Sequence, residues 1–261
     1  MSYTIVYKTY ENDLQWLYYS LLSVNKYVYD VNEIIIYYHN TCEVNFLKML
    51  STIILKIPYR IIPVNYDYHG YIKQMVVKMM CYKDITTDYI VIVDSDVIFD
   101  KKYTPKIKLL DNKIIWNISV KDEINKNEIQ WKVWEKSIIN MTKLPMTIFF
   151  MANGFPFIIK RQTLCDAHKK FIELHNEDYD IFCKKHLEQQ NVNISESVQS
   201  AFMRCATIFE EFEFIGWFAY NFTTDYIFYN DQSKNTNNYK QYWSHGGLND
   251  NIKAEILQIL E

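Results

Sequence analysis

The sequence predicts an α/β fold with a mostly parallel central sheet flanked by helices. Strand-like and helix-like segments alternate over the first hundred residues, and the strand-like segments contain continuous apolar runs. Continuous apolar strands separated by helices are typical of parallel sheets that are covered on both faces. With 261 residues, the chain is long enough for one large domain with a substantial core.

The first half is expected to contain four strands, each of the first three followed by a helix. The first helix has leucines at helical spacing, at positions 14, 17 and 21, and Asn12 or Asp13 precedes them as a cap. The expected strands are residues 4–9, 33–39, 59–65 and 89–99, and the expected helices are residues 12–27, 44–54 and 70–85.

The second half is less regular, and it reads as an elaboration of the same domain. We expect a strand, then an amphipathic helix or partly ordered insert, then two short strands around the turn Asn153-Gly154. Helical segments follow, with a break near Gly216, and a terminal helix ends the chain. The expected strand is residues 114–120, the helix or insert is residues 122–140, and the two short strands lie within residues 147–161. The helical segments before the terminal helix are residues 162–190 and 195–222. No linker or repeat divides the chain, so residues 1–261 are interpreted as a single domain.

Composition excludes several classes of protein. The formal net charge of −3 gives no basic excess for binding nucleic acid. The five cysteines contain no CxxC pair, which is typical of a reducing, cytoplasmic compartment. No apolar run approaches the roughly 20 residues of a membrane span, and no signal peptide is expected. The chain has neither GxGxxG nor GxxxxGK[ST], so a classical dinucleotide fingerprint and a P-loop are absent.

Two carboxylates interrupt the fourth predicted strand. Asp94 and Asp96 follow five apolar or aromatic residues and are followed by three more apolar ones. Residues two apart on a strand point to the same side, where two carboxylates repel unless a cation or hydrogen-bond donors intervene. Mg²⁺ and Mn²⁺ prefer such oxygen ligands. Ligands of open α/β sheets bind beyond the carboxyl ends of the strands, so the pair predicts a metal site at that edge. The alternative is a strand end with solvated aspartates.

The surrounding sequence resembles the metal-dependent GT-A glycosyltransferases. The segments GYIKQMVVKMM and DYIVIVDSDVIFD, from Gly70 to Asp100, are closest to a group of bacterial and viral candidate transferases. In that group a glycine-aromatic-x-x-Gln-x-x-x-Lys helix precedes a DSD strand. The resemblance covers nearly the whole chain in order, although only this block is specific. It implies a GT-A, Rossmann-like fold with a nucleotide-binding half at residues 1–100 and an acceptor-side half at residues 101–261.

The resemblance also implies roles for individual residues. A Mn²⁺ or Mg²⁺ ion would bind Asp94, Asp96 and His245 of the SHGG segment. Glu211 of EEFEFIGWF matches an acidic motif whose second carboxylate is the catalytic base in inverting members. Where the group usually has Tyr before the motif's glycine, this chain has Ile215. Residues expected to contact the donor are Thr9, Asp13, Gln74, Lys78, Asp94, Gly154 and Gly247.

Several of these residues have simpler interpretations. Lys78 is alternatively a solvent-facing lysine on its helix, and Asp13 only a helix cap. Gly154 alternatively belongs to a hairpin turn, for which Asn-Gly is the standard dipeptide. The acidic residues at 210, 211 and 213 are alternatively a solvated helix end.

The implied reaction moves a sugar from a nucleotide-sugar donor, of which UDP-sugars are the commonest in such enzymes, to a hydroxyl of a glycan, lipid or protein. An inverting reaction requires a base, for which Glu211 is the candidate, whereas in a retaining reaction Glu211 would position substrate. The sequence leaves this choice open. A bacterial cytoplasm, or a viral factory in a host cytoplasm, is the expected setting.

Two other functions remain as alternatives. A degenerate module would bind a nucleotide sugar without turnover. A DxD phosphatase of the haloacid dehalogenase type would use the first aspartate as nucleophile. That motif favours Thr or Val where this chain has Ile98, and it normally ends the first strand of its domain.

Overall fold

The structure is a computed structural model that describes residues 1–65, 67, 69–120, 129–150, 155–192, 204–230, 238–242, 244 and 247–261. The side chains of residues 129–131 are outside this description. Its centre is a five-stranded sheet in the order β10-β4-β1-β2-β3. The strands are β1 (Tyr3–Thr9), β2 (Glu33–His39), β3 (Tyr59–Val64), β4 (Tyr89–Ile92) and β10 (Phe157–Lys160). All pairs are parallel except β10 with β4. The predicted mostly parallel α/β sheet is therefore confirmed.

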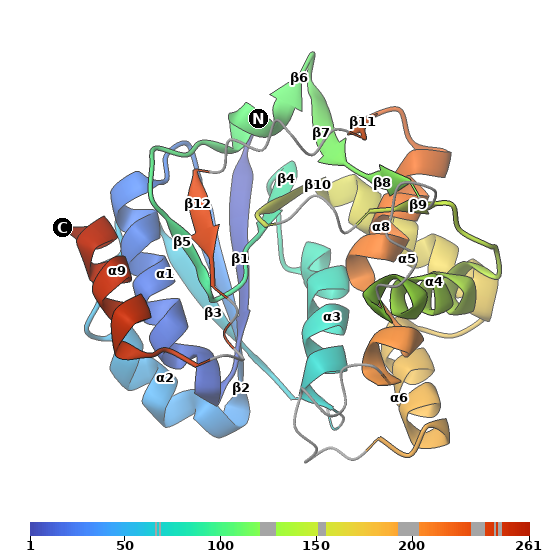
Figure 1. The fold of residues 1–261 in the computed structure, drawn as a ribbon, viewed down its shortest axis with the longest axis horizontal. Helices are drawn as coiled ribbons and strands as arrows, with labels where there is room; N and C mark the ends of the chain where they lie inside the picture. Colours follow the sequence, from blue (N-terminus) through green and yellow to red (C-terminus); the bar gives the residue numbers. More distant parts are fainter. Residues whose placement is uncertain are drawn as a thin grey trace.

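Helices cover both faces of this sheet (Figure 1). On one side lie α1 (Leu14–Tyr27), α2 (Glu43–Leu50) and α9 (Asp250–Leu260). On the other lie α3 (Gly70–Met80), α4 (Ile129–Thr142), α5 (Arg161–His175), α6 (Tyr179–Gln189) and α8 (Glu211–Phe222). Single 3₁₀ turns are η1 (Glu11–Asp13), η2 (Asn40–Cys42), η3 (Cys81–Lys83) and η4 (Pro105–Lys108). The double cover explains why the strands are apolar on both sides.

The strand order creates a crevice between β1 and β4. The chain moves outward from β1 to β2 and β3, and α3 then returns it to the opposite side of β1, where β4 pairs. Val6 in β1 lies between Ile35 of β2 and Ile92 of β4. Where strand order reverses in this way, the connections leave in opposite directions and open a crevice at the carboxyl ends. The two expected site segments, after β1 and after β4, meet there.

The later strands form small sheets around the central one. They are β5 (Val97–Phe99), β6 (Leu109–Leu110), β7 (Lys113–Asn117), β8 (Ser119–Val120), β9 (Ile148–Phe149), β11 (Tyr226–Tyr229) and β12 (Tyr239–Gln241). β12 pairs with β5, β8 with β9, and β7 with both β6 and β11. Because β10, β12 and α9 join elements of the first hundred residues, the two halves expected from the sequence are interleaved in space.

Several predicted segments are divided differently in the structure. The expected strand 89–99 is broken after Ile92 by a turn that carries both aspartates, and the expected strand 114–120 is split between β7 and β8. Residues 147–161 do not form a hairpin, because β9 pairs with β8 and β10 pairs with β4. The expected break at Gly216 is also wrong, since α8 runs through it and begins after residues 209–210.

Gly216 allows α8 to pack closely against Phe150. A Cβ atom at position 216 would overlap the Phe150 side chain. On the same helix, the Glu213 carboxylate accepts a hydrogen bond from the Phe150 N–H at 3.0 Å. The glycine is thus explained by close packing in the middle of a helix, where glycine is otherwise unfavourable.

We expect Gly216→Ala to lower the free energy of unfolding by about 2 kcal/mol, because overpacking of a dense core forces the neighbours to shift. Denaturant titration would measure the change. Gly70→Ala is the matched control, since a Cβ there meets nothing within 4 Å. If the two variants were equally stable, the packing explanation would be wrong.

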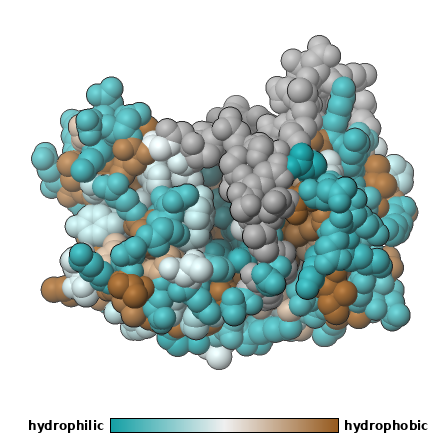
Figure 2. Space-filling model, turned by 90° about the horizontal axis from the view of Figure 1, so that it is seen from below, coloured by the Kyte–Doolittle hydropathy of each residue, from teal (hydrophilic) through white to brown (hydrophobic). Residues whose placement is uncertain are grey.

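The outer surface is mainly hydrophilic on the side toward which the amino end of α3 points. Figure 2 views this side and shows hydrophilic residues with scattered hydrophobic ones among them. Among the helices of the described residues, none combines the length and the apolar character needed to cross a membrane.

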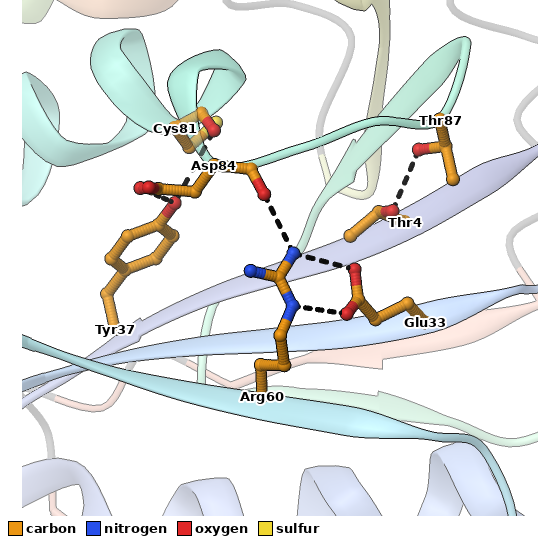
Figure 3. A network of polar contacts seen from close by, with 7 residues as sticks. All are labelled: Thr4, Glu33, Tyr37, Arg60, Cys81, Asp84 and Thr87. Atoms are coloured by element: carbon orange, nitrogen blue, oxygen red, sulfur yellow. Dashed lines mark hydrogen bonds and ion pairs between the residues drawn. The ribbon is translucent and has the colours of Figure 1, made fainter.

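A polar network fixes the sheet at the opposite, amino edge (Figure 3). Arg60 at the start of β3 forms an ion pair with Glu33 at the start of β2, and its guanidinium donates to the Asp84 carbonyl at 2.7 Å. The Tyr37 hydroxyl donates to the Asp84 carboxylate at 2.9 Å. These contacts join β2, β3 and the turn before β4 at the end of the strands away from the crevice.

Candidate functional site

The two predicted metal-binding aspartates lie on a turn at the carboxyl end of β4. Residues 93–96 connect β4 to β5, and the Val97 N–H donates to the Asp94 carbonyl at 3.1 Å. The expectation that both carboxylates share one side of a continuous strand is therefore wrong. The turn nevertheless places both of them at the crevice edge, Asp96 being buried and Asp94 about a fifth exposed.

Asp96 is held by the C-terminal segment of the chain. Its Oδ2 atom accepts from the Ser244 N–H at 2.8 Å, and its backbone carbonyl accepts from the Tyr242 N–H at 2.9 Å. Burial, and then the negative charge of Asp94, raise the pKa of Asp96 to about 7. The pairing of β12 with β5 brings this segment into place.

A cavity of about 320 Å³ is lined in part by Ser244, the residue whose N–H bonds Asp96. Its lining comes from the segment after β1 and from the C-terminal segment: Tyr10, Asn12, Asp13, Gln15, Trp16, Ser244, Gly247 and Leu248. Gly247 has a φ of 76°, a left-handed conformation that favours glycine. Two predicted donor contacts, Asp13 and Gly247, thus line one cavity, which is of the size of a small-molecule site.

Asp13 is not explained as a helix cap. It occupies the N-cap position of α1, but its side chain makes no capping hydrogen bond. Burial and the charge of Asp94 raise its pKa to about 6, against the opposing hydrogen bond from Ser244. The buried carboxylates of Asp13 and Asp96 and the partly exposed carboxylate of Asp94 therefore repel one another at the crevice.

Three buried oxygen atoms at this edge have no hydrogen-bond partner among the described residues. They are Thr9 Oγ1 at the end of β1, Ser95 Oγ, and Asp96 Oδ1 in the turn after β4. Buried polar atoms in native proteins are nearly always hydrogen-bonded, so each exception calls for a reason. The grouping of three such acceptors at the switch point indicates a polar ligand or cation there.

Lys78 is buried in the protein interior beneath Asp94. Its Nζ atom lies 2.9 Å from Asp94 Oδ1 and 3.2 Å from Glu211 Oε1. The rings of Phe155 and Phe212 lie 4.9 and 5.2 Å from the same ammonium. Burial alone would lower the pKa of Lys78, but the two carboxylates outweigh it and raise the pKa. The interpretation as a solvent-facing lysine is wrong, and the predicted contact with the DSD neighbourhood is present.

The acidic residues that begin α8 are buried. Glu210, Glu211 and Glu213 all lie inside the protein, so the alternative of a solvated helix end is wrong. Burial, and then the charge of Glu211, raise the pKa of Glu210 well above its usual value. Glu211 is the member that reaches Lys78, so α8 and the DSD turn are joined through one lysine.

The comparisons with known proteins identify a family. A family described as "Family of unknown function (DUF6492)" matches residues 21–258. The chain belongs to this family. None of the curated proteins matches it. Among solved structures, the DUF6492 chain matches a crystal structure of the galactosyltransferase LgtC in complex with donor and acceptor sugar analogs. That match has a TM-score of 0.45 and 14% identity, and it covers 68% of each chain.

The structure gives less information on three other predicted site residues of the DUF6492 chain. Gln74 is half-buried one turn before Lys78 on α3. Gly154 and His245 lie outside the described residues. The structure therefore brings Thr9, Asp13, Lys78, Asp94, Asp96, Glu211 and Gly247 to the region of the crevice.

The described residues provide only some of the ligands that a divalent cation would need. Within the described residues, no group of three or more His, Cys, Asp or Glu side chains is arranged to hold a metal ion. Two observations nonetheless favour a cation beside Asp96: its Oδ1 atom has no partner among the described residues, and its charge is opposed by Asp94 and Asp13. Asp94 already contacts Lys78 through Oδ1. A cation would therefore have Asp96 as its principal protein ligand, with Asp94 beside it.

A basic cluster near the crevice was missed by the sequence motifs. Lys8 in β1, His39 at the end of β2 and Lys73 in the first turn of α3 lie near one another. The only local signals are a lysine within the apolar run TIVYKT and a lysine at the positive end of a helix. Neither belongs to a recognised motif.

Proposed function

We propose that this DUF6492 protein is a GT-A-type glycosyltransferase that moves a sugar from a nucleotide-sugar donor, a UDP-sugar by preference, to a hydroxyl acceptor. The proposal also includes a Mn²⁺ or Mg²⁺ ion held by Asp96 and Asp94, with His245 as the further ligand expected from the sequence. Donor nucleotide contacts are assigned to the elements of residues 1–100 together with Gly154 and Gly247, and acceptor contacts to the rest of residues 101–261.

The main support for the proposal is the unfavourable environment of the Asp96 carboxylate. A buried carboxylate with one oxygen atom unused among the described residues, and a second carboxylate beside it, is electrostatically unfavourable. A divalent cation bridging to a pyrophosphate would relieve that repulsion. The cavity is lined by the segment after β1 and by Ser244, the residue whose N–H bonds Asp96. Nucleotides of α/β proteins bind beyond the carboxyl ends of the strands, at the switch point of the sheet.

The proposed reaction breaks the anomeric C–O bond of the donor and forms a new C–O bond with the acceptor oxygen. The nucleoside diphosphate departs with the bonding electrons, and the acceptor proton passes to a base. A bound cation would stabilise the negative charge that develops on the leaving phosphate. Lys78 fixes the Asp94 carboxylate at 2.9 Å, and Gly247 keeps the C-terminal segment close to Asp96.

The geometry favours a positioning role for Glu211. A catalytic base must reach the acceptor hydroxyl, directly or through one water molecule. In this structure the Glu211 side chain is 3% exposed, and it forms an ion pair with Lys78. We infer that Glu211 holds Lys78 against Asp94. Action as the base of an inverting reaction would require it to leave that ion pair.

Thermal unfolding with UDP and Mn²⁺ together tests the proposal. We expect the pair to raise the melting temperature more than either ligand alone, because a ligand that binds only the folded state stabilises it. Asp96→Asn should abolish the combined effect. Asp88→Asn is the matched control, since Asp88 is exposed at the amino edge and bonds Ser2.

Release of UDP from a panel of UDP-sugars then separates an enzyme from a binding module. Manganese-dependent release that is lost in Asp96→Asn would support transfer. Stabilisation without release from any donor would favour the non-catalytic alternative. If no nucleoside diphosphate stabilised the protein with Mn²⁺ present, the proposal as a whole would be rejected.

A further inference from the structure

Three basic side chains from separate elements gather beside the crevice. Lys73 Nζ lies 2.9 Å from His39 Nε2, and Lys8 Nζ donates to the Thr9 carbonyl at 2.6 Å. Lys8 and Lys73 are both buried. These groups come from the end of β1, the end of β2 and the amino turn of α3, so they meet at the carboxyl edge of the sheet.

The positive charges of this cluster oppose one another. Burial, followed by the charge of Lys73, lowers the pKa of Lys8 to about 8. Burial likewise lowers the pKa of Lys73, and burial and both lysines lower that of His39. Asp67 acts in the opposite direction on Lys73, but the net direction is still downward. Within the described part of the chain, neither Lys8 nor Lys73 forms an ion pair with a carboxylate.

The position of Lys73 is unfavourable for the helix itself. The amino end of a helix carries a partial positive charge, which favours acidic rather than basic residues in the first turn. The first turn of α3 has no acidic residue, and it contains Lys73. Among the described residues, a Cβ at Gly70 would meet nothing within 4 Å. A buried cation at a positive helix end is unfavourable unless an anion lies nearby.

We propose that Lys8, His39 and Lys73 form a binding site for a phosphoryl group, carried by inorganic phosphate or by a phosphate monoester. An ammonium group has three N–H donors, and among the contacts of the described residues each lysine uses one. The remaining donors can bind the several oxygen atoms of a phosphate. His39 orients Lys73, because its Nε2 contacts the Lys73 ammonium and its Nδ1 contacts Thr41 Oγ1. The tetrahedral dianion would offset the mutual repulsion of the lysines.

This cluster adjoins the proposed cation site, since the charge of Asp13 raises the pKa of Lys8 against the effect of burial, but the two sites draw on different elements. Asp13, Asp94 and Asp96 gather after β1 and β4, whereas the cluster includes the end of β2 and the start of α3. The acidic group needs a cation to accept a pyrophosphate, but the basic cluster needs none. Phosphate binding in the presence of EDTA is therefore specific to the basic cluster.

Isothermal titration with inorganic phosphate, at neutral pH, low ionic strength and with EDTA present, tests the proposal. We expect saturable binding that Lys8→Met and Lys73→Met each weaken by about tenfold or more, the effect of losing a charge-assisted hydrogen bond. Lys83→Met is the matched control, because Lys83 is exposed just beyond the other end of α3. Titration with ribose 5-phosphate identifies the source: tighter binding assigns the site to a phosphate monoester, and equal binding to free phosphate.

A second measurement guards against variants that simply unfold. Without phosphate, Lys8→Met should raise the melting temperature, because it removes one of two repelling buried charges, while it abolishes the rise caused by phosphate. Asp96→Asn should retain the phosphate response even if it loses the response to UDP and Mn²⁺, so the two proposals fail separately. Absence of phosphate binding, or equal binding by Lys8→Met, Lys73→Met and the parent protein, would overturn the phosphoryl site.

Discussion

Lys78→Met is expected to lower the free energy of unfolding by about 3–5 kcal/mol, the range found when one partner of a buried ion pair is removed. Lys78 is the cation between Asp94 and Glu211, and two aromatic rings pack around its ammonium. Met preserves most of the side-chain volume, so the loss reports the charge. Glu211 would be left buried without its cation. Denaturant unfolding monitored by circular dichroism would measure the change.

A double-mutant cycle separates this ion pair from a general effect of packing. Lys78→Met combined with Glu211→Gln should recover part of the lost stability, because the second change removes the carboxylate left behind. Lys160→Met is the control, since Lys160 pairs with Asp225 near the surface, where ion pairs contribute at most about 1 kcal/mol. Equal losses for Lys78→Met and Lys160→Met would contradict the account of a buried charge.

The elements of the first half could be predicted because their signals are local. Apolar strands and helically spaced leucines place β1, β2 and α1 within one or two residues of the structure. The predicted fourth strand failed for a reason that is not local. The turn at residues 94–96 is fixed by Ser244, which lies 148 positions away and donates to Asp96.

The second half was harder to predict because the partners of its strands are distant in sequence. An Asn-Gly dipeptide between two short apolar runs indicates a hairpin. Here β10 instead extends the central sheet beside β4, and β9 pairs with β8. Strand pairing is set by the surfaces available to bury each strand, so a turn signal alone does not determine it.

The candidate site likewise contains residues that could be predicted from local signals and residues that could not. Asp94, Asp96 and Lys78 stood out because a motif places them at known spacing, and the structure brings Lys78 within 2.9 Å of Asp94. The burial of Glu211 was not foreseen, since three acidic residues in a short segment suggest a solvated helix end. Lys8 and Lys73 had no motif, and their meeting depends on how α3 returns across the sheet.

Asp96→Asn is expected to stabilise the protein at alkaline pH and to reduce the dependence of its stability on pH. The pKa of Asp96 is about 7 in the folded protein, against an ordinary value of 3.8, so the folded state binds this proton more tightly than the unfolded state. The resulting stability is fully present below the unfolded pKa, and it is lost as the pH rises through about 7. Asp13, with a pKa of about 6, acts in the same direction over a narrower range.

Unfolding at about pH 5 and about pH 8 would measure the effect, which we expect to be on the order of 2–4 kcal/mol for the parent protein. Asp96→Asn removes the charge while keeping the shape, so it should be the more stable protein at the higher pH. If Asp96 binds a divalent cation, Mn²⁺ at the higher pH should stabilise the parent and leave Asp96→Asn unchanged. Asp88→Asn, which alters an exposed carboxylate whose pKa is lowered by Ser2, should not reproduce this pattern. Equal stability of the parent at both pH values would mean that the Asp96 carboxylate is not destabilised by its surroundings, and the main argument for a cation there would be lost.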